Sequence, residues 1–162
     1  MSQVTRIKAI GLDVDGVLTD GGLYLGAGGE ESKRICFADI MGISMGRREG
    51  LTYALISGEG GPLVRRIASK LQISHVYEDC RDKAGALKSL VDELGIGLSE
   101  VAYMGDDVND LAALRIAGLS SAPCSARPEV LKEAAFISRA PGGSGAVRDL
   151  IDHLLTASDE AP

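Results

Sequence analysis

Residues 7–20 read IKAIGLDVDGVLTD, an apolar run that ends on two carboxylates, Asp13 and Asp15. The apolar run predicts a buried β-strand, and residues two apart in an extended strand point to the same face. Two like charges at the end of a buried strand are costly unless a cation or hydrogen-bond donors offset them. Gly16 then allows backbone conformations that can aim N–H groups at an anion. The stretch is therefore either a metal and phosphate site or a strand followed by an ordinary Asp-Gly turn.

Length and composition limit the classes of protein to which the chain can belong. Its 162 residues suffice for one domain with a hydrophobic core, and 45% of them are hydrophobic. The net charge of −6 argues against nucleic acid or an anionic membrane as the main partner, but not against a small anionic substrate. No stretch has the pattern of a leader peptide or of a membrane span, so we expect a cytoplasmic protein. Three widely spaced cysteines indicate neither a disulfide framework nor a zinc site.

Outward from the opening stretch, strand and helix patterns alternate to the end of the chain. Strands are predicted at 51–56, 75–77, 100–104, 119–122 and 136–138. Helices are predicted at 40–49, 62–71, 82–94, 108–117, 127–135 and 146–155, with Asp39 as the N-cap of the first. The alternation predicts an α/β fold, a Rossmann-like parallel sheet with helices on both faces, in a single domain over residues 1–162.

Two segments depart from this alternation. Residues 21–37 are rich in glycine and predict a β-hairpin, with strands at 21–25 and 33–37 around a turn at 26–29. Residues 158–162 are expected to form a frayed tail. A hairpin and one helix fill the chain between Asp15 and Ser57, which leaves no room there for a separate domain.

Polar residues follow three of the predicted strands and gather at one edge of the sheet, because parallel strands end on the same side. The members are Asp13 and Asp15, Ser57, Asp106 and Asp107, with Lys83 at the start of an intervening helix. Each has an ordinary alternative, such as a turn or an acidic helix start. Together they supply a nucleophile, a second acid, a metal-binding acid, a hydroxyl and a cation. That combination is typical of a Mg²⁺-dependent phosphoryl-transfer site.

At these residues the chain resembles the haloacid dehalogenase superfamily. Four motifs match in order and spacing: Asp13-Val14-Asp15-Gly16-Val17, Ser57, Lys83 and Gly105-Asp106-Asp107-Val108-Asn109-Asp110. The first motif with its hairpin, and the late Gly-Gly-x-Gly-Ala-Val-Arg, are similar to the capless phosphatases of 3-deoxy-ulosonic acid metabolism. Those enzymes act on octulosonate 8-phosphate or nononate 9-phosphate. The resemblance implies a homotetramer in which a neighbouring subunit covers the active site.

The resemblance also implies the chemistry of the first motif and its metal. Asp13 would attack phosphorus and form an aspartyl-phosphate. Asp15 would protonate the leaving alkoxide and then activate water. Mg²⁺ would bind Asp13, the backbone carbonyl of Asp15, and Asp106. Asp107 would support the metal site, and Asp110 would orient Lys83 or the loop.

The resemblance also implies which residues recognise the substrate, and here the chain departs from the usual residues of the octulosonate 8-phosphate phosphatases. Ser57, Gly58 and Lys83 would hold the phosphate. Octulosonate 8-phosphate phosphatases usually have Arg where this chain has Glu59, and Arg in the late glycine loop where it has Ser144. The nine-carbon enzymes have Glu at the first position and a Lys that matches Lys70.

Two alternatives to this function remain open at this point. Some relatives have lost catalysis and serve as tetramerisation domains of sialic-acid cytidylyltransferases. The chain could also be a phosphatase of the same superfamily that acts on another small phosphorylated metabolite. All four motif positions are occupied by the residues that catalysis needs, which favours an enzyme.

Overall fold

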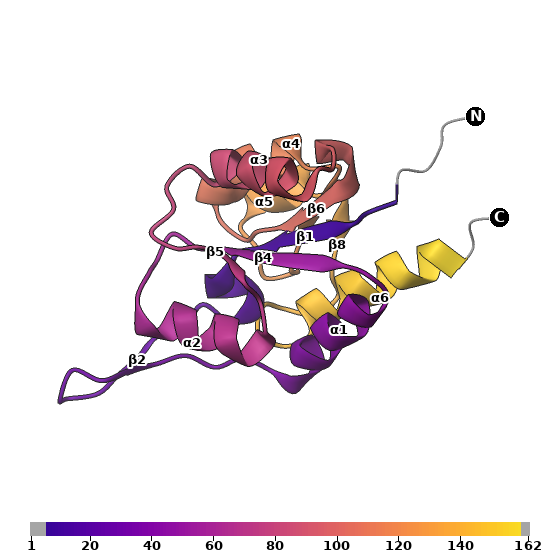
Figure 1. Cartoon of the computed structure of the whole chain (residues 1–162). Helices are drawn as coiled ribbons and strands as arrows, with labels where there is room; N and C mark the ends of the chain where they lie inside the picture. Colours follow the sequence, from indigo (N-terminus) through magenta and orange to yellow (C-terminus); the bar gives the residue numbers. More distant parts are fainter. Residues whose placement is uncertain (1–5, 160–162) are drawn as a thin grey trace.

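A computed structural model describes residues 6–159 of the chain (Figure 1). The sheet has six strands in the order β5-β4-β1-β6-β7-β8, and every pairing in it is parallel. Its strands are β1 (Ala9–Leu12), β4 (Thr52–Ile56), β5 (His75–Tyr77), β6 (Val101–Met104), β7 (Leu119–Ala122) and β8 (Phe136–Ile137). The predicted α/β fold with a parallel sheet is confirmed.

Helices cover both faces of this sheet (Figure 1). On one face lie α1 (Phe37–Arg48), α2 (Pro62–Leu71) and α6 (Ala146–Asp159). On the other lie α3 (Lys83–Leu94), α4 (Leu111–Ile116) and α5 (Pro128–Glu133). Each face has its own hydrophobic core, because a sheet covered on both sides must bury side chains in both directions.

β1 lies at the centre of the sheet, between β4 and β6. Ile10 and Leu12 pack into the core beneath α1, α2 and α6, whereas Ala9 packs into the core beneath α3. All three side chains are fully buried. The apolar run in residues 7–12 is thus the central strand, and the acidic residues that follow it emerge in the middle of one sheet edge.

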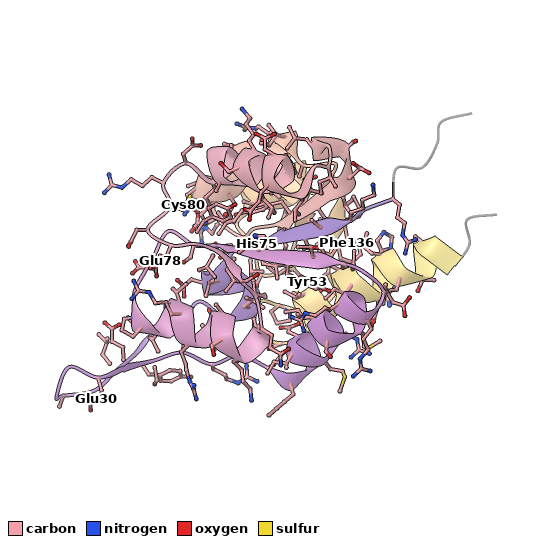
Figure 2. All side chains as sticks on the ribbon, in the orientation of Figure 1. Glu30, Tyr53, His75, Glu78, Cys80 and Phe136 are labelled. Atoms are coloured by element: carbon pink, nitrogen blue, oxygen red, sulfur yellow. The ribbon has the colours of Figure 1, made fainter. Side chains whose placement is uncertain are left out.

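The hairpin is shorter than predicted. Its strands are β2 (Tyr24–Leu25) and β3 (Glu31–Ser32), which pair antiparallel around the turn at 26–29. It projects from the body of the molecule, with Glu30 near its tip (Figure 2). The predicted strand at 33–37 is wrong, because only Ile35 forms a bridge, to Thr19, before α1 begins at Phe37.

Asp39 is not the N-cap of the first helix, so that prediction is wrong. Cys36 occupies the N-cap position of α1, and Asp39 is buried in the first turn. The Asp39 Oδ1 atom accepts a hydrogen bond of 2.9 Å from the backbone N–H of Arg148, in the first turn of α6. Asp39 therefore satisfies a free donor at the start of another helix, which local sequence does not reveal.

Two further helices differ from the prediction. The predicted helix at 108–117 is split into a 3₁₀ turn, η3 (Val108–Asp110), followed by α4. The α6 helix runs to Asp159, past its predicted end at 155 and into the predicted tail, whose last three residues lie outside the described residues. Among the described residues, no helix is both long enough and apolar enough to cross a membrane.

Candidate active site

The two acids of the first motif do not continue the strand. β1 ends at Leu12, and Asp13 (φ −68°, ψ 160°) caps a five-residue turn, η1 (Val14–Leu18), by accepting a 2.7 Å hydrogen bond from Val14 N–H. The chain turns within this segment because Gly16 has a φ of +82°. The expectation that both carboxylates share a strand face is therefore wrong, and each carboxylate has partners of its own.

Asp13 belongs to a buried charge network with Lys83 and Asp110. The Lys83 Nζ atom lies 3.1 Å from Asp13 Oδ1 and 2.8 Å from Asp110 Oδ1. All three side chains are buried. Burial raises the pKa of Asp13 well above its usual value, and the charge of Asp110 raises it further. Burial lowers the pKa of Lys83, but the charges of Asp13 and Asp110 outweigh that effect and keep the lysine cationic.

Both oxygens of Asp110 are already engaged. The Tyr103 hydroxyl donates a 2.6 Å hydrogen bond to Oδ1, which also contacts Lys83. The backbone N–H groups of Asp106 and Asp107 donate to Oδ2 at 2.9 Å and 3.2 Å. Asp110 thus contacts both the lysine and the loop after β6.

Asp13, Asp106 and Asp110 each offer an oxygen, and these oxygens lie within 4.8 Å of one another. Since Asp110 is saturated by other donors, Asp13 and Asp106 are the members left to face a metal ion. The Asp106 Oδ1 atom is buried and has no hydrogen-bond partner, which is costly unless a cation occupies the space beside it. Burial, with the charge of Asp110, raises the pKa of Asp106 to about 6.

Gly16 lets the loops after β1 and β6 meet. A Cβ atom at this position would collide with the carboxylate of Asp106. The positive φ and the close approach both require glycine. Gly16, which follows Asp13 and Asp15, thus also makes room for Asp106.

Ser57 follows β4 and is fully buried, and its Oγ atom accepts a 3.2 Å hydrogen bond from Glu59 N–H. A Cβ atom on Gly58 would lie 3.7 Å from the side-chain Nδ2 atom of Asn109. The loop after β4 therefore lies against the loop after β6. Figure 2 shows Glu78 and Cys80 at the same edge, where β5 ends. The Cys80 N–H donates a 2.9 Å hydrogen bond to the Ser57 carbonyl and helps to hold the loop after β4.

Three predicted residues are not joined to the buried network by any described side-chain contact. Glu59 and Lys70 are exposed, and Lys70 lies in the last turn of α2, roughly 12 Å along the axis from Pro62 at about 1.5 Å per residue. Asp107 is also exposed, and its Oδ1 atom caps η3 by accepting from Val108 N–H at 2.7 Å.

The sequence did not reveal a lysine beside Asp15. The Lys33 Nζ atom, on the segment after β3, lies 2.8 Å from Asp15 Oδ1. Tyr103, which contacts Asp110, was also missed. The only available signal for Tyr103 was a large polar side chain in a buried strand, because a buried tyrosine hydroxyl needs a partner.

The late glycine loop packs against the turn after β1. The Gly143 N–H donates to the Val17 carbonyl at 3.0 Å, and a Cβ atom on Gly142 would collide with the carbonyl of Gly16. Ser144, where some relatives have arginine, has an exposed side chain. This loop buttresses the turn that carries Asp13 and Asp15.

This arrangement has counterparts among known proteins. Residues 55–148 match the haloacid dehalogenase-like hydrolase family. The chain belongs to that family. The 3-deoxy-D-manno-octulosonate 8-phosphate phosphatase of Escherichia coli BL21 is 38% identical over 99% of this chain and 87% of its own length. Together with the assembled residues, these matches show that the chain is a phosphoric monoester hydrolase.

Solved structures of this family agree closely with the fold. The octulosonate 8-phosphate phosphatase of Moraxella catarrhalis, in complex with magnesium, phosphate and 3-deoxy-D-manno-octulosonate, has a TM-score of 0.91 and 36% identity, covering 95% of this chain and 88% of its own. The cobalt-bound enzyme of Haemophilus influenzae has a TM-score of 0.92 and 34% identity, covering 97% and 92%.

Proposed function

We propose that this chain hydrolyses 3-deoxy-D-manno-octulosonate 8-phosphate with the help of Mg²⁺, through an aspartyl-phosphate on Asp13. The observation that carries the proposal is the buried network in which Lys83 lies 3.1 Å from Asp13. It holds a nucleophilic carboxylate beside a fixed cation at the sheet edge where ligands of such folds bind. The identity to octulosonate 8-phosphate phosphatases over nearly the whole chain supports the choice of substrate.

The reaction takes place in two steps. An Asp13 oxygen attacks phosphorus, the bond from phosphorus to the sugar oxygen breaks, and Asp15 gives its proton to the departing alkoxide. Asp15 then takes a proton from water as the water oxygen attacks the phosphorus of the intermediate. The bond to Asp13 breaks, which releases inorganic phosphate, restores the Asp13 carboxylate and leaves Asp15 protonated for the next cycle.

The donor set fits Mg²⁺, a hard cation that prefers oxygen ligands. Asp13, Asp106 and the backbone carbonyl of Asp15 would hold it, with Asp107 as support, and the unpaired Asp106 Oδ1 atom is the observation that favours this. When bound, the ion would polarise the phosphoryl group and offset its negative charge. Ser57, the Gly58 N–H group and Lys83 would hold the phosphate oxygens.

A second copy of the chain is the partner in this proposal. Large apolar side chains are exposed on the hairpin and on the start of α1: Leu23, Tyr24, Leu25, Phe37 and Met41. Exposed apolar groups of this size are typical of a protein interface. We propose a homotetramer in which a neighbouring subunit covers the active site, as the family resemblance implies.

A second substrate is favoured by two residues. Glu59 stands where the nine-carbon enzymes have glutamate, and Lys70 matches their lysine. Both side chains are exposed and thus free to meet a substrate or a neighbouring subunit. We therefore propose 2-keto-3-deoxynononate 9-phosphate as the alternative substrate. The non-catalytic alternative is disfavoured, because all four motif positions keep the residues that catalysis needs.

The test compares phosphate release from the two sugar-acid phosphates, at equal concentration, with Mg²⁺ and with EDTA. We expect release that requires Mg²⁺, with a higher kcat/KM for octulosonate 8-phosphate. A higher kcat/KM for nononate 9-phosphate would select the alternative substrate. No release from either compound, or from a wider panel of sugar phosphates, would refute the proposed function.

A further inference from the structure

We propose that Lys33 is a positioning residue, which holds the carboxylate of Asp15 in the orientation needed for proton transfer. The proposal rests on the proposed function, in which Asp15 is the acid and base. The Lys33 Nζ atom lies 2.8 Å from Asp15 Oδ1. This contact joins the hairpin segment to the first motif, and neither the family motifs nor local sequence patterns indicate it.

The backbone that presents Lys33 is held in place. The next residue, Arg34, donates a 2.8 Å hydrogen bond from Nη1 to the carbonyl of Gly143. Ile35 forms a bridge with Thr19. The hairpin leg is thus attached on one side to the late glycine loop and on the other to the end of the turn that carries Asp15.

The turn itself is closed by Thr19. Its Oγ1 atom accepts hydrogen bonds of 3.2 Å from the N–H groups of Gly16 and Gly21. Thr19 is fully buried. Asp15 and Lys33 therefore lie on two segments that share Thr19 as an anchor, so the distance between their side chains is set by the fold rather than by chance encounter of two surface groups.

Burial separates this pair from an ordinary surface ion pair. The Lys33 side chain is 10% exposed, whereas that of Asp15 is 33% exposed. In the surface pair of Lys8 and Glu100, by contrast, the lysine is 55% exposed. Such surface pairs contribute little to stability or orientation. A lysine covered this well loses much of its hydration, and Asp15 is its one ion-pair partner among the described residues.

The difference in exposure also argues against Lys33 as a phosphate-binding group. Asp15 has the more open side chain, so substrate can approach its carboxylate while Lys33 supports it from the covered side. Proton transfer requires the acid to lie within hydrogen-bond reach of the leaving oxygen, and a fixed carboxylate avoids the entropy lost in orienting it. Without Lys33, Asp15 could rotate away from that oxygen.

The test measures how the reaction depends on the leaving group. A positioned acid matters most when the leaving group is a poor one, such as an alkoxide, and little when it is p-nitrophenolate. The kcat/KM values of wild type and Lys33→Met are measured with substituted phenyl phosphates and one sugar phosphate. The quantity kcat/KM reports the step in which the leaving group departs.

We expect Lys33→Met to lower kcat/KM for the sugar phosphate about 10- to 100-fold, part of the roughly 100- to 10,000-fold that general acid catalysis contributes, and for p-nitrophenyl phosphate less than about 3-fold. The plot of log kcat/KM against leaving-group pKa should therefore become steeper. Lys33→Arg should recover most of the loss. Lys8→Met, which removes the lysine of a surface pair, should leave the plot unchanged.

A double-mutant cycle makes the test specific to Asp15. Asp15→Asn should steepen the plot by itself, and adding Lys33→Met should cause little further change. Equal losses on all substrates, or a rise in KM alone, would overturn the role of Lys33. If Lys33→Met does not fold, Lys33→Gln provides the same comparison, and Lys33→Arg remains the variant expected to recover the loss. Asp13→Asn separates the two proposals, because retained activity in that variant would refute the proposed function itself.

Discussion

Asp13 and Asp15 are two residues apart, yet they belong to different regions of the molecule. Asp13 is 5% exposed and is enclosed by Lys83 and Asp110, which come from α3 and the loop after β6. Asp15 is partly open and is paired with Lys33 from the hairpin side. In the proposed mechanism, this difference allows the same chemical group to act as a nucleophile at Asp13 and as an acid and base at Asp15. A nucleophile benefits from a fixed, dry environment, whereas an acid and base must exchange protons with water.

The largest effect on activity should come from replacing Asp13, the enclosed carboxylate. Asp13→Asn keeps the size of the side chain but removes the proposed nucleophile, so we expect kcat to fall at least about 1000-fold. Steady-state phosphate release from octulosonate 8-phosphate measures it. Asp92→Asn, at an exposed position on α3, is the matched control and should leave kcat unchanged. Comparable loss in both variants would show that the nucleophile lies elsewhere.

Breaking the network around Asp13 should affect activity and stability together. Lys83→Met leaves Asp13 and Asp110 buried without their cation, so we expect the free energy of unfolding to fall by about 3 kcal/mol in EDTA. Urea denaturation measures this change. Lys33→Met should lower the free energy of unfolding by clearly less than Lys83→Met, because Asp15 can turn to solvent when its partner is removed. Equal costs for the two variants would contradict the contrast between the enclosed and the open carboxylate.

Magnesium should stabilise the protein more at pH 7.5 than at pH 5.0. Burial, with the charge of Asp110, raises the pKa of folded Asp106 to about 6, above the ordinary value of 3.8. The folded state therefore holds a proton that the unfolded state releases, and metal-free stability falls as the pH rises from about 4 to 6. Above that range the carboxylate is charged and Mg²⁺ offsets it.

Melting temperatures with 5 mM Mg²⁺ and with EDTA, at both pH values, test this linkage. The Mg²⁺-induced shift should be larger at pH 7.5, and Asp106→Asn should remove most of the difference. An equal shift at both pH values in the wild type would mean that Asp106 does not control metal binding.

The smallest effect on the folded subunit is expected at the hairpin. Leu25 is 71% exposed, so Leu25→Glu should change the unfolding free energy of a subunit by less than about 0.5 kcal/mol. It should nevertheless disrupt the proposed tetramer, which light scattering would reveal. Glu30→Gln, near the hairpin tip, is the control and should leave the mass unchanged. A wild-type protein that is monomeric at micromolar concentration would refute the assembly.

Much of the fold and part of the site could be predicted from local pattern. The apolar run of β1 and the helical spacing of α2 are determined by a few neighbouring residues, so the α/β class and the boundaries of α2 were predicted correctly. The gathering of Asp13, Ser57 and Asp106 at one edge followed from the rule that parallel strands end on the same side.

Tertiary structure alone decided which partner each of these groups has. Lys33 reaches Asp15, and Tyr103 reaches Asp110, through segments whose proximity depends on how the loops pack. The partner of Asp39 was also decided by long-range packing, because its carboxylate accepts a backbone N–H hydrogen bond from the first turn of α6 rather than from its own helix. Residue type and spacing thus determined that two acids stand at the centre of a sheet edge. Only long-range packing, which places separate segments within hydrogen-bond distance, decided that one acid is enclosed and the other is open.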